Sequence, residues 1–460
     1  MRFATKVTVT LTLLGAPLLF AAGCAPVGSG NSPMPAAAAP LSVVQPAMAQ
    51  TANWERAATM LAWPQFGYDP GHSGYNPLEK TLKTGNVSAL QTAWDNSSII
   101  QPRGIVVSGP TVYIADQDQA TGSVFALSAA NGKQRWATNV GLSGSWGSFE
   151  GVPAVSGNVV LTPCSNQSAS NFRTGLCGLK AKSGKIIWSD LCSTSAGGCG
   201  GLPNHGTSPT VYNGLAYFQM TNSPNEQPDI YGVDPQSGNV VWDVGGSYLF
   251  HCPDAGGPIN PLPAADGHVF AVLPCQTKGT QIVTKICALS ASSGAAAWCT
   301  VSQSAYVDRL VEGEGKVFAS EDIGSGTSIV AMNEKTGNVL WKSTSLPHNV
   351  GGIAVADHRV FVNYYFTLYA LSVQTGKSLW TQTQDTAAGT ASVANGVVYT
   401  NTFGGNNGDH AIAALNEKTG AIIWASSAGN GASPATPVIV NGTVYAGCYT
   451  VCAFTLKAKR

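Results

Sequence analysis

The sequence predicts an all-β fold, an eight-bladed β-propeller of four-stranded antiparallel blades closed by pairing its N- and C-terminal strands. Three observations predict it. A motif close to A-L-x-x-x-x-G-x-x-x-W recurs along the chain, a hairpin turn precedes each copy, and half a motif stands at each end of the repeated region. Two hairpins in every ~40–50 residues are typical of a propeller blade.

The first 23 residues resemble the signal peptide of a bacterial lipoprotein. Arg2 and Lys6 give a positive start, and residues 7–20 are apolar but too few to span a bilayer. Small residues then lead directly to Cys24, as in the lipobox where a Cys receives lipid. We therefore expect lipidation at Cys24; the alternative is an ordinary signal peptide followed by a chance Cys. No later stretch is apolar enough for a transmembrane helix.

Residues 24–61 are predicted to form a flexible tether, and residues 62–460 the propeller. The stretch 25–51 is rich in Ala, Pro, Ser and Gly and contains no charged residue. Such a composition offers no periodic apolar face and is typical of linkers. The expected protein is exported and anchored to a membrane by its lipid, facing the periplasm or the cell exterior.

A Trp recurs once in every predicted blade, and successive members are 39 to 56 residues apart. A Trp on an outer strand can bury its ring between neighbouring blades while its N–H finds a backbone carbonyl. The motif Gly permits the turn between the third and fourth strands. We interpret the set as structural: Trp94, Trp136, Trp188, Trp242, Trp298, Trp341, Trp380 and Trp424.

A second hairpin turn precedes each motif copy, and most of these turns contain Asn, Asp or Gly, which tolerate positive φ. Residues 451–456 are expected to be the third strand of the last blade, and residues 90–94 its fourth, which joins the two ends of the ring. The predicted turns are Ser108-Gly109, Gly157-Asn158, Asn213-Gly214, Asp266-Gly267, Glu314-Gly315, Asp357-His358, Asn395-Gly396 and Asn441-Gly442.

The charge balance excludes a protein that binds nucleic acid through bulk charge. Lys+Arg and Asp+Glu both number 24, so the net charge is zero, and charged residues make up only 10% of the chain. Nucleic-acid affinity depends on many cationic contacts to phosphates. The 44% hydrophobic content and the low charge also argue against a disordered chain, which would be poor in apolar residues and rich in charge. We expect a monomer that binds an envelope protein.

Eleven cysteines in an exported chain predict disulfides. With Cys24 set aside for lipid, ten remain, and their pairing is open. No C-x-x-C, H-E-x-x-H or C-x-x-C-H pattern occurs, so neither a zinc site nor a haem site is predicted. The expected pairs are Cys164 with Cys177 and Cys275 with Cys287 inside equivalent hairpins, Cys192 with Cys199, Cys448 with Cys452, and Cys252 with Cys299 as the remainder.

The fuller motif A-x-[DN]-x-x-T-G-x-x-x-W resembles the tryptophan-docking motif of pyrroloquinoline quinone (PQQ)-type propellers. Residues 331–341 and 414–424 match it closely, and the segments 63–67 and 75–78 are similar to the start of quinoprotein alcohol dehydrogenases. The resemblance covers about residues 62–457. It implies the propeller fold, because in this family the Trp and Gly of the motif hold neighbouring blades together, and it says little about a cofactor.

Quinoprotein dehydrogenases bind PQQ over the propeller axis with a calcium ion. Their adjacent Cys pair and their Glu-x-x-x-Arg-Gly stretch are absent from this sequence. Some residues just before the innermost strands could still line one mouth of the axis, where Arg would suit an anionic quinone and carboxylates would suit calcium. The alternative is that they are rim residues hydrogen-bonded to loops or water. The candidates are Trp146, Glu150, His205, Asp254, Asp308, Arg309, His348 and Asn349.

The sequence therefore predicts a cell-envelope lipoprotein whose PQQ-like propeller is a protein-binding or scaffold module. It is similar to the propeller lipoprotein of the outer-membrane β-barrel assembly machinery in its lipid anchor, eight blades and repeats. The competing hypothesis is a PQQ-dependent alcohol or polyvinyl-alcohol dehydrogenase. No G-x-S-x-G nucleophile motif appears, which gives no support to a serine hydrolase. Whether the chain is an enzyme stays open, because fold alone does not determine function.

Overall fold

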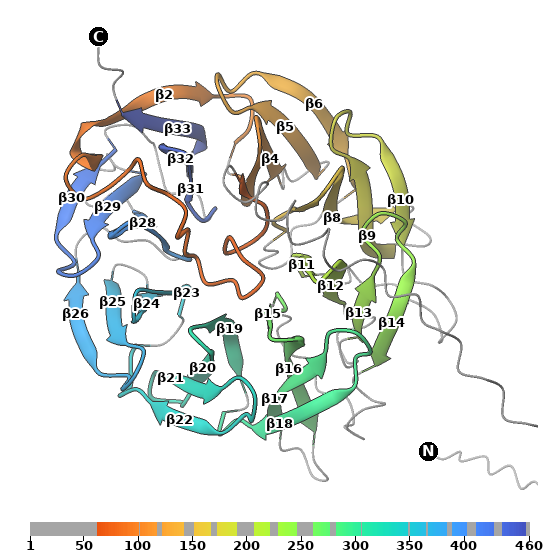
Figure 1. The fold of residues 1–460 in the computed structure, drawn as a ribbon, viewed down its shortest axis with the longest axis vertical. Helices are drawn as coiled ribbons and strands as arrows, with labels where there is room; N and C mark the ends of the chain where they lie inside the picture. Colours follow the sequence, from red (N-terminus) through yellow and green to blue (C-terminus); the bar gives the residue numbers. More distant parts are fainter. Residues whose placement is uncertain are drawn as a thin grey trace, which may run out of the picture. The chain divides into compact units, whose positions relative to one another are not determined.

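Eight β-sheets follow one another around a central axis in the computed structural model, and Figure 1 views the ring along that axis. All described residues belong to one compact unit, Ala49–Arg460. The structure describes residues 62–100, 102–116, 122–141, 151–166, 173–190, 207–220, 229–245, 261–276, 282–304, 306–347, 350–364, 367–383, 389–402, 411–426 and 435–456.

Each sheet is one blade, and its four strands run antiparallel from the innermost to the outermost. Blades 1 to 4 consist of β3 (Gly104–Ser108), β4 (Thr111–Asp116), β5 (Ser123–Ser128) and β6 (Gln134–Asn139); β7 (Ala154–Ser156), β8 (Val159–Asn166), β9 (Arg173–Lys180) and β10 (Ile186–Asp190); β11 (Thr210–Tyr212), β12 (Leu215–Met220), β13 (Asp229–Val233) and β14 (Val240–Gly245); β15 (Ala264–Ala265), β16 (His268–Gln276), β17 (Ile282–Ser290) and β18 (Ala296–Val301).

The remaining blades follow the same plan, and the predicted eight-bladed, four-stranded architecture is confirmed. Blades 5 to 8 consist of β19 (Val307–Gly313), β20 (Lys316–Asp322), β21 (Thr327–Asn333) and β22 (Val339–Lys342); β23 (Gly352–Ala356), β24 (Arg359–Tyr364), β25 (Thr367–Ser372) and β26 (Ser378–Gln382); β27 (Ser392–Ala394), β28 (Val397–Asn401), β29 (Ile412–Asn416) and β30 (Ile422–Ala425); β31 (Val438–Val440), β32 (Thr443–Cys448), β33 (Thr450–Leu456) and β2 (Leu90–Asn96).

The ring closes through blade 8, as the sequence predicts. β2, from the N-terminal side, pairs with β33, and Trp94 lies opposite Ala453 in that pairing. Blade 1 departs from the prediction because a short strand, β1 (Ala62–Trp63), adds a fifth strand beside β3. A single 3-10 turn, η1 (Val87–Ala89), precedes β2. No helix among the described residues is long and apolar enough to cross a membrane.

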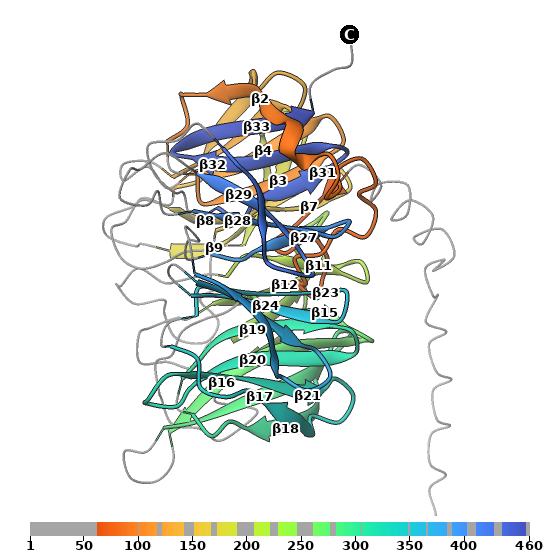
Figure 2. The same ribbon diagram turned by 90° about the vertical axis from the view of Figure 1, so that its left-hand side faces the viewer.

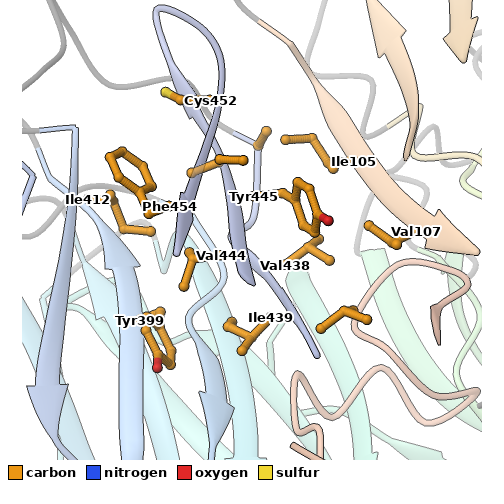
Figure 3. Packing of buried hydrophobic residues seen from close by; sticks show 14 of the residues in the cluster. Ile105, Val107, Tyr399, Ile412, Val438, Ile439, Val444, Tyr445, Cys452 and Phe454 are labelled. Atoms are coloured by element: carbon orange, nitrogen blue, oxygen red, sulfur yellow. The ribbon is translucent and has the colours of Figure 1, made fainter. Parts of the chain in front are cut away.

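The core lies between the blades, not within them. Figure 3 shows Tyr399 and Ile412 of blade 7 on one side of β31–β33, and Ile105 and Val107 of blade 1 on the other. Phe454, only 1% exposed, belongs to this cluster. Because a twisted strand presents alternate side chains to its two faces, each blade buries both faces against its neighbours.

The repeated Trp and Gly residues join each blade to the next. In every case the indole Nε1–H donates to a backbone carbonyl of the next blade, for example from Trp242 to Ala291 at 2.9 Å and from Trp424 to Leu90 at 3.1 Å. For seven of the eight Trp residues, the ring also lies against the motif Gly of that blade: a Cβ on Gly294 would come within 2.7 Å of the Trp242 ring. The motif Gly therefore provides contact space as well as the positive φ of its turn.

Three disulfides occur among the described residues, and two match the predicted pairs: Cys164–Cys177 and Cys448–Cys452. The third is Cys287–Cys299, so the predicted Cys275–Cys287 and Cys252–Cys299 pairs are wrong.

Strand register explains this correction. Cys287 lies directly opposite Cys299 on β18, whereas its partner on β16 is Ala271, four residues from Cys275. Four residues of strand are roughly 13 Å, too far for a disulfide. The predicted Cys192–Cys199 pair and Cys252 lie outside the described residues.

Candidate functional site

Only two of the predicted axis-mouth residues lie in the part of the chain that the structure describes. Asp308 and Arg309 are in β19, the innermost strand of blade 5. They lie at the end of the ring opposite the turns between first and second strands. The others lie outside the described residues: Trp146, Glu150, His205, Asp254, His348 and Asn349.

Asp308 lies at an irregularity in the pairing of β19, between the partners Val307–Glu321 and Arg309–Ser320. Burial raises the pKa of its carboxyl group; Arg309 opposes the rise and Asp322 adds to it. Bulges of this kind often redirect a side chain near functional sites.

The Arg309 guanidinium donates to backbone carbonyls on two blades. Its Nε–H lies 3.2 Å from the carbonyl oxygen of Gly351, and its Nη1 lies 3.4 Å from that of Asp308. No group of three His, Cys, Asp or Glu side chains within the described ranges is arranged to hold a metal ion. Asp308 and Arg309 alone therefore do not make up the donor set for calcium and PQQ that the resemblance implies.

A different feature occupies the axis at the other end of the ring. Residues 62–76, here called the strap, contact the innermost strand of each blade in turn. Figure 1 shows this stretch as an orange trace across the centre of the ring. On blade 1, β1 of the strap pairs with β3. On each of the next six blades, a backbone N–H of the innermost strand donates to an oxygen of the strap. The donors and their acceptors are Val155 to the Pro64 carbonyl (2.7 Å), Val211 to Gln65 Oε1 (2.7 Å), Ala264 to the Pro70 carbonyl (2.8 Å), Glu312 to the Gly71 carbonyl (2.8 Å), Val355 to the Ser73 carbonyl (2.7 Å) and Val393 to the Gly74 carbonyl (2.7 Å).

The circuit ends on blade 8, where Asn76 Nδ2 donates to the carbonyl of Ile439 at 2.7 Å. The eight contacted positions are equivalent, each two residues before a first hairpin turn. Innermost strands are sheet edges, and edge strands leave backbone groups unpaired. The strap satisfies one such group on each blade and so covers the axis at this end, the strap end.

A tight turn shapes the middle of the strap. Gly74 N–H donates to the carbonyl of Gly67 at 2.8 Å, and the Asp69 carboxylate accepts from the backbone and the hydroxyl of Ser73. His72 adopts a left-handed φ of 60°, and its Nε2 lies 2.8 Å from Thr210 Oγ1. Burial lowers the pKa of His72 to about 3, so this imidazole is neutral at physiological pH.

A pocket of about 460 Å³ opens between the strap and blades 5 and 6. The strap contributes Asp69, Ser73 and Tyr75. The two hairpin turns add polar groups that are already paired. The Tyr75 hydroxyl donates to Asp357 at 3.0 Å, and His358 Nδ1 lies 2.9 Å from Glu314.

Three carboxyl groups in and beside the pocket have raised pKa values. Burial raises the pKa of Glu312 to about 8, with Glu334 and Asp69 adding to the rise. Burial likewise raises the pKa of Asp69 to about 6, against the hydrogen bonds from Ser73. Beside the pocket, burial raises the pKa of Glu417 to about 7; Asp357 adds to the rise and Arg359 opposes it. These groups can hold or release protons near neutral pH, the range useful for acid–base chemistry or a pH-sensitive contact.

The sequence prediction missed this pocket, although the sequence contains a signal for it. Seven of the eight strap-contacting positions are aliphatic, and the eighth is Glu312. An acidic side chain in an otherwise aliphatic register stands out once the blades are aligned. Its partner Asp69 comes from a segment without repeats, which offers no such alignment.

Comparisons with known proteins agree with the propeller fold. Tetrathionate hydrolase of Acidithiobacillus ferrooxidans is 25% identical over 387 residues, which are 81% of this chain and 62% of that protein. This chain therefore spans less than two thirds of that relative's length.

Among solved structures, quinohemoprotein alcohol dehydrogenase of Comamonas testosteroni is similar with a TM-score of 0.66 at 13% identity, covering 89% of this chain and 82% of that one. A europium-containing methanol dehydrogenase gives 0.60 at 13% identity, with 84% and 89% covered. Likeness at such low identity concerns the fold alone.

A family model matches nearly all of the ring. Its three matched segments are residues 83–245, 226–345 and 325–457. The matches begin after the strap and include every blade. The chain therefore belongs to the family described as outer membrane protein assembly factor BamB.

Proposed function

We propose that this protein is an exported, lipid-anchored propeller that acts as a rigid scaffold and binds another envelope protein. The observation that supports it most is the strap, which ties all eight innermost strands together at one end of the ring. A ring closed both by β2–β33 and by the strap resists blade separation, and binding by a pre-organised surface costs little conformational entropy.

The proposed location follows from the N-terminus and the cysteines. Residues 1–23 would be removed on export, Cys24 would receive lipid, and residues 24–61 would tether the ring. Disulfides such as Cys164–Cys177 persist in oxidising compartments and are rare in the cytosol. Membership of the BamB family adds to this proposal, because that description names an assembly factor for outer membrane protein.

The proposed partner surface is the end of the ring opposite the strap. The strap covers the axis at its own end, which leaves the other end for a partner. Tyr449, in the turn between β32 and β33, is 42% exposed there and adopts a left-handed φ of 68°. An exposed Tyr held in such a conformation is a good anchor for a partner, since aromatic side chains contribute strongly to interfaces.

A photo-crosslinking residue at position 449 tests the scaffold proposal in the living cell. We expect a defined adduct with an envelope β-barrel protein, and none from a matched probe at Leu340, which is equally exposed on the outer strand β22. Purified protein would also be titrated with PQQ and Ca²⁺, and dye-linked alcohol oxidation would be followed. Calcium-dependent turnover, or adducts from both probe positions alike, would contradict the scaffold.

An enzyme acting at the same end is the second candidate, in line with the competing dehydrogenase hypothesis. The identity to tetrathionate hydrolase over 81% of this chain favours testing that substrate as well as alcohols. Asp308, with its raised pKa and its bulge, is the described acid–base candidate there. Consumption of tetrathionate by the wild type, reduced at least ~100-fold by Asp308→Asn, would support this function. Consumption of neither tetrathionate nor alcohols would exclude it.

A further inference from the structure

The two ends of the ring carry different exposed charges. At the strap end, ten Lys and Arg side chains among the described residues are exposed, against three exposed acids: Asp266, Glu314 and Asp357. A chain with zero net charge thus concentrates cations on one face. The exposed cations are Lys80, Lys83, Lys133, Arg135, Lys180, Lys182, Lys185, Lys335, Lys377 and Lys418.

The repeat itself supplies most of these cations. The turn between the third and fourth strands carries Lys either two residues before the motif Gly or directly after it, and all these turns lie at the strap end. Blades 1, 2, 5, 6 and 7 contain such a Lys, whereas blades 3 and 4 have Gln236, Ser237, Ser292 and Ser293 in that turn. Lys80 and Lys83 follow the strap beside blades 7 and 8, where Asn395 donates to the Leu82 carbonyl.

The cations therefore form an arc, here called the basic arc, from blade 5 through blade 8 to blade 2. Figure 2 views the ring edge-on, and the strap end is the side on which the orange trace lies. Like-signed charges spread over one face produce a field that adds up at a surface facing it.

Acidic groups at the strap end oppose this field only weakly. Asp266 is paired with Lys335 at 3.2 Å, so this acid and this lysine together add no net charge to the face; Glu314 is paired with His358 and Asp357 with Tyr75. Burial keeps Glu312 largely protonated at neutral pH, since its pKa is raised to about 8. Glu79 is only 2% exposed and accepts backbone N–H groups.

The opposite end shows no such accumulation in the described ranges. Its exposed charges there are Asp95, Asp243 and Lys342, and Lys342 is bonded to Glu321 at 2.9 Å. Among the described residues, exposed cations are therefore concentrated at the strap end and are not spread evenly over the surface.

We propose that the basic arc binds the anionic phospholipid headgroups of a bilayer, so that the strap end of the ring lies on the membrane. Two observations choose a membrane over other anions. The chain enters the ring at this end, because Ala62 pairs with Ser108; this step rests on the proposed function, in which the preceding segment carries the lipid anchor. Leu78, 39% exposed beside Lys80, adds an apolar contact. Lysines near an anionic bilayer each strengthen binding, within about a Debye length of the surface.

Vesicle binding tests the proposal. The protein would be produced from residue 24 with Cys24→Ser, so that neither an acyl chain nor the signal peptide contributes. We expect binding to phosphatidylglycerol–phosphatidylcholine vesicles, weakening with added salt, and no binding to pure phosphatidylcholine. Lys→Gln at positions 133, 182, 185, 377 and 418 should lower the partition coefficient by roughly fivefold per residue, and Lys→Arg at the same positions should preserve it.

A footprint on the wild type makes the test independent of the variants' folding. Acetylation of the five lysines should slow in the presence of anionic vesicles, while Lys342 at the opposite end keeps its rate. Equal binding to neutral and anionic vesicles, no binding at all, or protection of Lys342 instead of the arc would each overturn the proposal. The outcome is separate from the scaffold and enzyme tests, because neither PQQ, tetrathionate nor a protein partner is present.

Discussion

The outer and inner circumferences of the ring are held together by different means. On the outside, a Trp in every blade donates to a backbone carbonyl of the next blade, and seven of the eight Trp rings also contact a motif Gly, as between Trp242 and Gly294. On the inside, one continuous strap contacts each blade with a different one of its own residues, from Trp63 on blade 1 to Asn76 on blade 8. The repeat fixes how neighbouring blades pack, whereas the strap relates all eight blades to one segment.

This difference indicates where a unique functional site can arise in a repeat protein. A contact repeated eight times cannot distinguish one blade from another. The strap is not repeated, so it can create a unique site, and it does so where Asp69 and Gly71 meet Glu312. Burial raises the pKa of both carboxyl groups at this point, and Asp69 adds to the rise at Glu312.

Removing one outer contact should have the largest effect. Trp242→Ala deletes a side chain that is only 8% exposed, together with its hydrogen bond to Ala291. We expect a loss of about 3–5 kcal/mol in the free energy of unfolding, measured by chemical denaturation. Leu340→Ala, at a half-exposed position on β22, is the control and should change stability by no more than ~0.5 kcal/mol. Equal losses for both would show that the Trp is not an inter-blade contact.

Crowding the strap should cost less, because it disturbs one contact with one blade. A Cβ on Gly71 would lie 2.7 Å from both the carbonyl oxygen and the carboxylate of Glu312. Gly71→Ala should therefore lower the free energy of unfolding by about 1–3 kcal/mol. Gly85→Ala is the matched control, since nothing lies within 4 Å of its added Cβ. If the two variants unfold alike, the strap does not bear on ring stability.

The repeat explains why the fold could be predicted. Eight Trp positions and eight hairpin turns gave the blade number and the β2–β33 closure, because both depend on local patterns. The disulfides were predicted less well: pairing Cys287 needs strand register, and a shift of two residues between blades 2 and 4 decides it. The strap pocket was not predicted, since its contacts join Asp69 to Glu312 across more than two hundred residues without a repeat.

The protonation of Glu312 gives the strap a pH dependence that the outer contacts lack. Its pKa is raised from 4.5 to about 8 in the folded protein, so the folded state keeps a proton that the unfolded state loses. Stability should therefore fall as pH rises from about 4.5 to about 8 and change no further above it. Glu312→Gln removes this loss. The free energy of unfolding of the variant, relative to that of the wild type, should therefore increase by at least ~1 kcal/mol across that pH window.

Thermal unfolding between pH 4 and 9 would measure this difference. Asp243→Asn, at an exposed position on β14, serves as the control and should follow the wild type. An advantage of Glu312→Gln that is the same at every pH would show that the carboxyl does not titrate against the strap. Glu334, which faces Glu312 from the neighbouring turn, should show a smaller effect of the same sign when changed to Gln.

The smallest effect should come from the rim of the pocket. Tyr75→Phe removes one hydrogen bond to Asp357 at a partly exposed position, so we expect a loss of about 0.5–1 kcal/mol in the free energy of unfolding. The same change should also raise the rate of amide hydrogen exchange beside the strap more than in the outer strands. The reason is that Tyr75 directly follows Gly74, whose carbonyl binds blade 7. Amide hydrogen exchange at Val393, whose N–H donates to Gly74, measures this directly. We expect faster exchange at Val393 and unchanged exchange at Ala414 of the same blade, which would place the effect on the inner circumference. Uniformly faster exchange across blade 7 would instead show that the ring is one cooperative unit in which inner and outer contacts cannot be separated.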